Sequence, residues 1–219
     1  MIKDKKYIYI SVILLFISMA LNFPFPHKNP YGVELISILD RPITTVNGIN
    51  FVAITSLLLL LASLYLLVKS LEKYHVRFVL IAIMLAIFAP PFAANSFQKT
   101  IATGIYAISY QSDESTCNFQ MKNETTLHGV CELFFENYSN ENTQFTIEFY
   151  ERYPFEEDVR MISLMNNDAP YEVGLSGKES KRVIIEADID VTQMENQVEF
   201  GEAKFVSIII KAGKITRKV

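Results

Sequence analysis

FVLIAIMLAIFAPPFAANSFQ, residues 78–98, is the stretch around which the rest of the chain is organised. Its 21 residues carry no charged side chain. At about 1.5 Å of rise per residue, a helix of this length crosses a hydrocarbon layer of about 30 Å. The sequence before it is rich in apolar runs, whereas the sequence after it alternates like a water-facing β domain. We therefore predict a membrane domain at residues 1–98 and a second domain at residues 99–219.

Charge is distributed unevenly about this boundary. Residues 1–98 contain 8 Lys and Arg against 4 Asp and Glu, a balance of +4, whereas residues 99–219 contain 12 against 20, a balance of −8, which together give the chain's −4. Phosphate binding needs clustered Lys and Arg. The acidic second domain is therefore not expected to bind nucleic acid.

Two further apolar segments precede residues 78–97 and predict two more membrane spans. Residues 51–68 (FVAITSLLLLLASLYLLV) predict one span, and residues 7–23 (YIYISVILLFISMALNF) predict another that is somewhat short. The first segment has an alternative interpretation, because its basic start, apolar run and Ser18-Met19-Ala20 also fit a cleavable signal peptide. The apolar run continues past that cleavage point to Phe23, which favours an uncleaved helix. Both interpretations place the loop that follows outside the cytoplasm.

Residues 24–50 predict an external loop with an amphipathic helix of its own. Asn29-Pro30 fits a helix N-cap followed by proline at the first helical position. Val33, Ile36 and Leu39 then recur at helical spacing, and Pro42 ends the pattern. Two interpretations are equally open: a helix lying on the outer membrane surface, or a helix packed on the other membrane segments.

The basic residues predict the orientation in the membrane. Short loops rich in Lys and Arg stay in the cytoplasm. The connection between the second and third spans carries Lys69, Lys73 and Arg77, and the N-terminus carries lysines at positions 3, 5 and 6. We therefore expect a multi-pass protein of the cell membrane, with a cytoplasmic N-terminus and an extracytoplasmic C-terminal domain.

Pro90-Pro91 falls in the outer half of the third span. The pair predicts either a hinge or the end of the helix near Phe88, with the following residues leaving the bilayer in extended form. We favour the helix end, because none of the three spans contains an ionisable residue that would mark a pathway to gate. For the same reason, a transporter or pump acting alone is not expected.

Residues 99–219 predict an all-β domain. Short segments rich in β formers, separated by turn residues, predict strands at 105–110, 116–121, 127–136, 144–151, 159–165, 182–189 and 203–211, with a shorter one at 171–175. The alternation places Phe145, Ile147 and Phe149 in the core. Seven or eight strands without a soluble helix predict an antiparallel two-sheet sandwich of immunoglobulin or fibronectin type III style.

Cys117 and Cys131 lie symmetrically about Glu124, the centre of a polar turn. If Met121 pairs with Leu127 in an antiparallel hairpin, Cys117 lies directly opposite Cys131. Opposed positions on neighbouring strands bring Cβ atoms close to disulfide distance. We therefore predict a disulfide between these two cysteines, in keeping with an oxidising compartment.

Known catalytic constellations are missing from the sequence. The three histidines fall in different segments, and no phosphate-binding loop, nucleophile elbow or zinc-protease motif occurs. The acidic stretches Glu156-Glu157-Asp158 and Asp188-Ile189-Asp190 lack the glycine turn of a calcium loop and read as solvated. We predict no catalytic, cofactor-binding or metal site.

Two minor features remain. Asn123-Glu124-Thr125 and Asn137-Tyr138-Ser139 match the glycosylation sequon and are expected in turns. The basic residues between Lys211 and Lys218 predict either a last hairpin arm or a tail that contacts anionic polymers.

The leading functional hypothesis is a non-enzymatic membrane protein that presents an extracytoplasmic β-sandwich. Its expected partners are the lipid bilayer and one or more proteins, either as a direct binder or as an accessory subunit of a membrane complex. The alternatives are a ligand sensor that regulates a membrane assembly and, with less support, a transporter component. Fold class alone does not choose among them.

Overall fold

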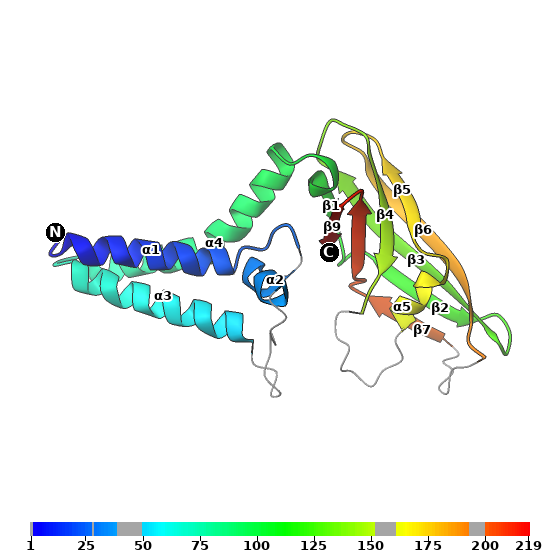
Figure 1. Ribbon diagram of the computed structural model, residues 1–219, viewed down its shortest axis with the longest axis horizontal. Coiled ribbons are helices and arrows are strands. Elements are labelled where there is room, and N and C mark those ends of the chain that lie inside the picture. The colour runs from blue at the N-terminus through cyan, green and yellow to red at the C-terminus, as the bar shows by residue number, and fades with distance from the viewer. Residues whose placement is uncertain (1, 28, 39–49, 152–160, 193–199) are drawn as a thin grey trace. The chain divides into compact units, whose positions relative to one another are not determined.

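A computed structural model describes residues 2–27, 29–38, 50–151, 161–192 and 200–219 (Figure 1). The chain divides into two compact units, Met1–Ser96 and Phe97–Val219. We describe each unit by itself.

The first unit is built on a pair of antiparallel helices, α1 (Lys5–Leu21) and α3 (Phe51–Ser70) (Figure 1). Buried serines join them: Ser11 Oγ donates to the Ser63 carbonyl oxygen at 2.9 Å, and Ser63 Oγ donates back to the Ser11 carbonyl oxygen at 2.8 Å. One α1 heptad further on, Ser18 Oγ donates to the Ser56 carbonyl oxygen at 2.9 Å. In an apolar environment such bonds between helices stabilise one particular pairing.

The N-terminus lies beside the end of α3. The Lys3 backbone N–H donates to the Ser70 carbonyl oxygen at 2.7 Å, and Ile2 forms a β-bridge with Leu71. The two basic segments of the first unit are thereby held at the same end of the helix pair.

Helix α2 (Tyr31–Ile38) packs against the opposite ends of α1 and α3. A Cβ atom added to Gly32 would lie 2.6 Å from Val52 Cγ1 and 3.0 Å from the Leu21 carbonyl oxygen, so only glycine allows this approach. Of the two interpretations of the helix predicted in residues 24–50, the structure supports the packed one. The predicted positions Leu39 and Pro42 lie outside the described residues.

Helix α4 (His75–Thr100) runs without interruption through Pro90 and Pro91. The predicted helix end near Phe88 is therefore wrong. The two prolines remove only two backbone donors, whereas an extended segment in lipid would leave every backbone group without its helical partner. Keeping the helix is the smaller cost.

Two described helices, α3 and α4, are long and apolar enough to cross a membrane, by length and composition. Helix α1 has 17 residues and is shorter.

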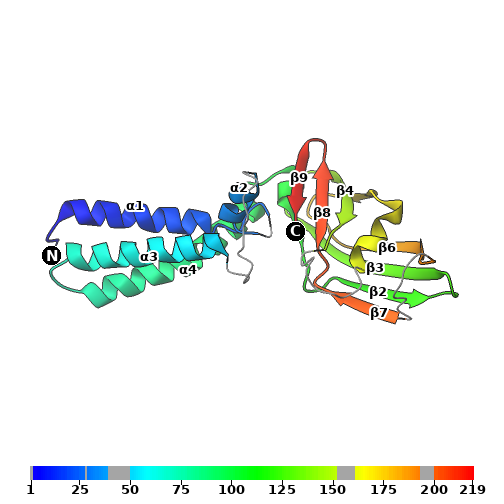
Figure 2. The same cartoon turned by 60° about the horizontal axis from the view of Figure 1, so that its bottom comes forward.

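The second unit is an all-antiparallel, sandwich-like arrangement of two sheets (Figure 2). The central strand of the first sheet is β3 (Thr126–Asn137), which pairs with β6 (Ser180–Asp190) from Thr126 to Glu136 and also with β2 (Thr116–Met121) and β1 (Ile108–Tyr110). The first sheet consists of β6 (Ser180–Asp190), β3 (Thr126–Asn137), β2 (Thr116–Met121) and β7 (Phe200–Lys204), with β1 (Ile108–Tyr110) also on β3. The second sheet has the order β5 (Tyr171–Leu175), β4 (Thr143–Phe149), β8 (Ile208–Ala212) and β9 (Ile215–Lys218).

The core of this unit lies between the two sheets. The predicted inward residues Phe145, Ile147 and Phe149 are all buried, as are Ile185 and Ile189 of β6. Side chains of the first sheet meet those of the second directly, for example Phe135 and Phe145, whose ring centroids lie 5.5 Å apart. The alternation in the sequence thus indicated the core face of these strands correctly.

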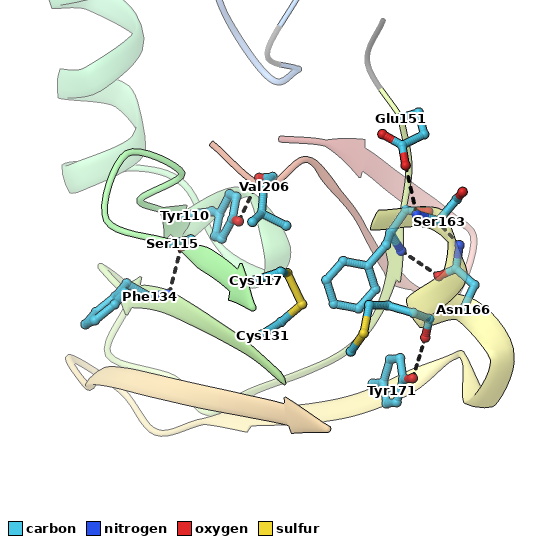
Figure 3. Close-up of a disulfide and its surroundings, with 12 residues drawn as sticks. Tyr110, Ser115, Cys117, Cys131, Phe134, Glu151, Ser163, Asn166, Tyr171 and Val206 are labelled. Carbon is cyan, nitrogen blue, oxygen red and sulfur yellow. Dashed lines mark hydrogen bonds between the residues drawn. A yellow bond between two sulfur atoms is a disulfide. The ribbon is translucent and has the colours of Figure 1, made fainter. Parts of the chain in front are cut away.

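The strand predicted at residues 159–165 is wrong, since the described part of it forms α5 (Met161–Leu164) and the start of the 3-10 helix η2 (Met165–Asp168). Asn166 explains the difference: its side chain accepts from the Phe149 N–H and donates to the Phe149 carbonyl oxygen, both at 2.7 Å (Figure 3). One amide thus takes the place of a neighbouring strand. Met165 is fully buried over Gly129, where an added Cβ would lie 2.5 Å from Met165 Sδ.

The single strand predicted at residues 203–211 is also wrong. The chain leaves the first sheet after β7 and enters the second as β8, with Phe205 between them at φ +56°. A positive φ is unfavourable for a residue with a Cβ atom, and here it turns the chain from one sheet to the other. Residues 105–107, predicted as strand, belong to the 3-10 helix η1 (Gly104–Ala107).

The pairing of α1 with α3 predicts a specific cross-link. Ser11→Cys with Ser63→Cys is expected to form a disulfide on oxidation of membranes, because the two Oγ atoms lie 3.3 Å apart. Mass spectrometry of proteolytic peptides, in a background without Cys117 and Cys131, measures the product.

The matched control is Ser11→Cys with Leu61→Cys, since Leu61 is exposed on α3. Equal cross-linking of both pairs would contradict the pairing. If α1 were removed as a signal peptide, the disulfide between positions 11 and 63 could not form. The same measurement therefore decides between the two interpretations of residues 7–23.

Candidate interaction surface

The β2–β3 hairpin has the register predicted from the sequence. Met121 lies opposite Leu127, Phe119 opposite Gly129, and Cys117 opposite Cys131. The two cysteines form a disulfide with a Cα–Cα distance of 4.0 Å, and both are fully buried (Figure 3). The bond therefore fixes two neighbouring strands from within the core.

The two sequons differ in accessibility. Asn123 is exposed in the hairpin turn, and its Oδ1 accepts from the Thr125 backbone and hydroxyl at 3.0 Å each. Asn137 is fully buried, and its amide donates to the Glu141 and Ser176 carbonyl oxygens at 2.8 and 3.0 Å. Only Asn123 can receive a bulky modification in the folded chain.

The residues considered for chemistry are not gathered into one site. His75 lies in the first unit, with Nδ1 3.0 Å from the Val68 carbonyl oxygen, whereas His128 lies in the second beside Asp188. Among the described residues, no group of three or more His, Cys, Asp or Glu side chains is placed to hold a metal ion. The acidic stretch Glu156–Asp158 lies outside the described residues.

Asp188 is instead the centre of an ionic cluster on the first sheet. Lys122 Nζ lies 2.8 Å from both carboxylate oxygens, and His128 Nδ1 lies 2.6 Å from one of them. Lys122 and then His128 hold the pKa of the Asp188 carboxyl below its usual value. The cluster joins the β2–β3 turn to β6.

The outer face of the first sheet carries apolar side chains among these charges. Ile184 of β6 is 56% exposed and Phe200 of β7 is 77% exposed. Beside Ile184, the Arg182 guanidinium lies 4.7 Å from the centre of the Phe134 ring and 3.1 Å from a Glu132 carboxylate oxygen. Exposed apolar groups held between arginine and aromatic side chains are typical of protein-binding surfaces.

The outer face of the second sheet is different. It holds a hollow of about 620 Å³ across β4, β5 and β8, in which Lys211 Nζ lies 2.6 Å from both Glu148 carboxylate oxygens. Gly174 leaves space opposite Gln144, since an added Cβ would have only one neighbour, at 3.9 Å. Both polar and apolar residues line this hollow.

The basic residues near the C-terminus form a hairpin arm, β8–β9, in agreement with one of the two predictions. Arg217 is buried, and its Nη1 donates to the carbonyl oxygens of Ile105 and Ile108 at 2.5 and 2.7 Å. Burial lowers its pKa to about 10, so it remains a cation at neutral pH. Arg217 thus anchors the last strand to η1.

Comparisons with protein-family models, with curated proteins and with solved structures found no match to this chain.

Loss of the disulfide predicts a measurable loss of stability. Cys117→Ala with Cys131→Ala should lower the free energy of unfolding of the second unit by about 3 kcal/mol, because the bond closes a loop of about 15 residues in the unfolded chain. Urea unfolding of the full chain in mild detergent, followed by circular dichroism, measures this change.

Asn118→Ala is the matched control, since Asn118 is the exposed next residue on β2 and its loss should cost less than about 0.5 kcal/mol. Labelling of either cysteine in unfolded, unreduced protein would contradict the disulfide.

Proposed function

We propose that this chain is a non-enzymatic, multi-pass protein of the cell membrane that presents its β-sandwich outside the cytoplasm to bind another protein. The observation that carries the proposal is the combination in one chain of long apolar helices with a sandwich that holds a buried disulfide. Helix α4 ends at Thr100, and η1 begins only four residues later at Gly104. So short a connection to an apolar helix supports a sandwich that acts close to the bilayer surface.

The proposed orientation has three spans, α1, α3 and α4, with the N-terminus in the cytoplasm. Its support is the bridge between Ile2 and Leu71, which holds the lysines of residues 3–6 at the same end of the helix pair as Lys69 and Lys73. Basic loops remain cytoplasmic, and disulfides persist in oxidising compartments. Charge and redox chemistry thus favour the same orientation.

The proposed style of the sandwich is that of immunoglobulin and fibronectin type III domains. Its support is the strand order, in which β2-β3-β6 face β5-β4-β8-β9. In the order of the chain this arrangement is A-B-E against C′-C-F-G, with β7 added beside the first strand. Such domains serve many functions, so the style adds no activity of its own.

Protein binding is favoured by the outer face of the first sheet, where Ile184 and Phe200 are exposed among charged residues. The hollow on the second sheet favours one other candidate, a sensor that binds a small polar ligand beside Glu148 and Lys211. The two candidates use opposite faces of the sandwich and can be separated by experiment.

The proposed orientation predicts that Asn123 can be glycosylated. When the full chain is synthesised into eukaryotic microsomes, Asn123 should acquire one glycan, because it is exposed and, in this orientation, lumenal. Gel mobility before and after glycosidase treatment measures the modification.

Asn123→Gln should abolish the shift, whereas Asn137→Gln should leave it unchanged, because Asn137 is buried. An unglycosylated wild-type chain would place the sandwich in the cytoplasm and contradict the proposal.

Protein binding predicts recovery of a stoichiometric partner. Purification of the tagged chain from its native membranes in mild detergent should give a complex whose partner is lost with Ile184→Asp and kept with Glu172→Lys on the other sheet. Quantitative mass spectrometry measures the ratio. A monomer without bound protein would favour the sensor instead.

A further inference from the structure

The first sheet presents a regular outer face in which the register brings side chains of four strands into rows. One row runs from Glu202 through Asn118 and Val130 to Glu186, and the next runs from Lys204 through Thr116 and Glu132 to Ile184. The rows on either side of these two contain Phe200 with Asp188, and Phe134 with Arg182. We call these four rows the outer β-face.

Three apolar side chains lie close together at the centre of the outer β-face, with Glu132 between Val130 and Phe134 along β3. Val130 and Phe134 are half-buried on β3, and Ile184 projects beside them from β6 with 56% of its surface exposed. No large hydrophobic residue of the described strands is exposed on the outer face of the second sheet, where Glu172, Thr146 and Lys211 occupy one row. Of the two outer faces as described, only that of the first sheet thus carries exposed large apolar side chains, whereas Ile209 on the second is half-buried.

Carboxylates surround this centre. The described strands of the first sheet direct six of them outward: Glu132, Glu136, Glu186, Asp188, Asp190 and Glu202. Three cations lie among them, and each is beside a carboxylate, as Lys122 with Asp188, Arg182 with Glu132 and Lys204 with Glu202. Three carboxylates therefore remain in excess, and Glu186 stands next to both Val130 and Ile184.

We infer that the outer β-face binds a cationic segment of another protein, with an apolar side chain of that segment seated on Val130 and Ile184 and its Lys or Arg residues beside Glu186 and its neighbours. This inference rests on the proposed function and adds the chemistry of the partner. Complementary charge accelerates association and fixes orientation, whereas like charges oppose it. A second copy of the same face and an anionic lipid surface are both negative, so neither matches it.

Two synthetic peptides test the inference on the full chain in phosphatidylcholine nanodiscs. One peptide alternates lysine with leucine and the other alternates glutamate with leucine, and fluorescence anisotropy measures binding at two salt concentrations. The lysine peptide should bind, with an affinity that falls as salt rises, and the glutamate peptide should not. Empty nanodiscs correct for binding to lipid.

Variants locate the binding. Glu186→Lys and Ile184→Asn should each weaken binding of the lysine peptide roughly tenfold, the effect of losing one central contact of an interface. Glu172→Lys makes the same charge change on the other sheet and should leave the affinity within about twofold. An unchanged thermal unfolding midpoint shows that each exposed substitution leaves the fold intact.

Absence of binding, equal binding of the glutamate peptide, or equal loss with Glu172→Lys would each overturn the inference. Because the peptide assay does not depend on the compartment, its failure is distinguishable from failure of the topology test. If the recovered native partner is acidic where it contacts this face, the inference is wrong although the proposed function stands.

Discussion

The register of β3 against its neighbours is the constraint on which the second unit depends. This strand pairs with β2 and β1 and, from Thr126 to Glu136, with β6. A slip of β3 by one residue would turn each of its own core side chains toward the solvent. The Cys117–Cys131 bond holds that register covalently at one buried pair. Gly129, on the same face, leaves the space in which Met165 closes the core. The same pairing also arranges the outer β-face. Because the core residues of β3 alternate with outward ones, fixing the core register fixes which apolar and acidic side chains lie next to each other on the outer β-face.

The sequence could predict those features that depend on local period or symmetry. Alternation indicated the core face of β4, and the symmetric spacing about Glu124 indicated which residues face each other across the hairpin. It could not predict features that depend on a distant partner. The strand propensity of residues 161–165 was overridden because Asn166 bonds to both backbone groups of Phe149, and the apolar run at 203–211 concealed a change of sheet at Phe205. The sequence placed Arg217 in either a hairpin arm or a basic tail, and only the folded chain brings the carbonyl groups of Ile105 and Ile108 to it.

The candidate surface was less predictable than the fold. Asp188 looked like part of a solvated acidic stretch, and its contacts with Lys122 and His128 arise from strands that are distant in the sequence. Nothing in the sequence indicated that Val130 and Phe134 would lie beside Ile184. The first unit did carry a further signal within its apolar runs, since Ser56, Ser63 and Ser70 recur at the seven-residue spacing that also separates Ser11 from Ser18. The shared spacing indicates that α1 and α3 can pair through their serines, but it fits more than one register.

Because the serines are seven residues apart on both helices, successive serines of α1 and α3 lie opposite each other. Every contact between the serines requires α1 and α3 to keep the same phase, and one inserted residue would rotate all later side chains of its helix by about 100°. The segment between the two helices is held by a different contact, the packing of α2 at Gly32 against Val52 and Leu21. A change of length within α1 or α3 should therefore separate the serine pairs on one side of the change, and the phase of the two helices is what keeps the first unit together.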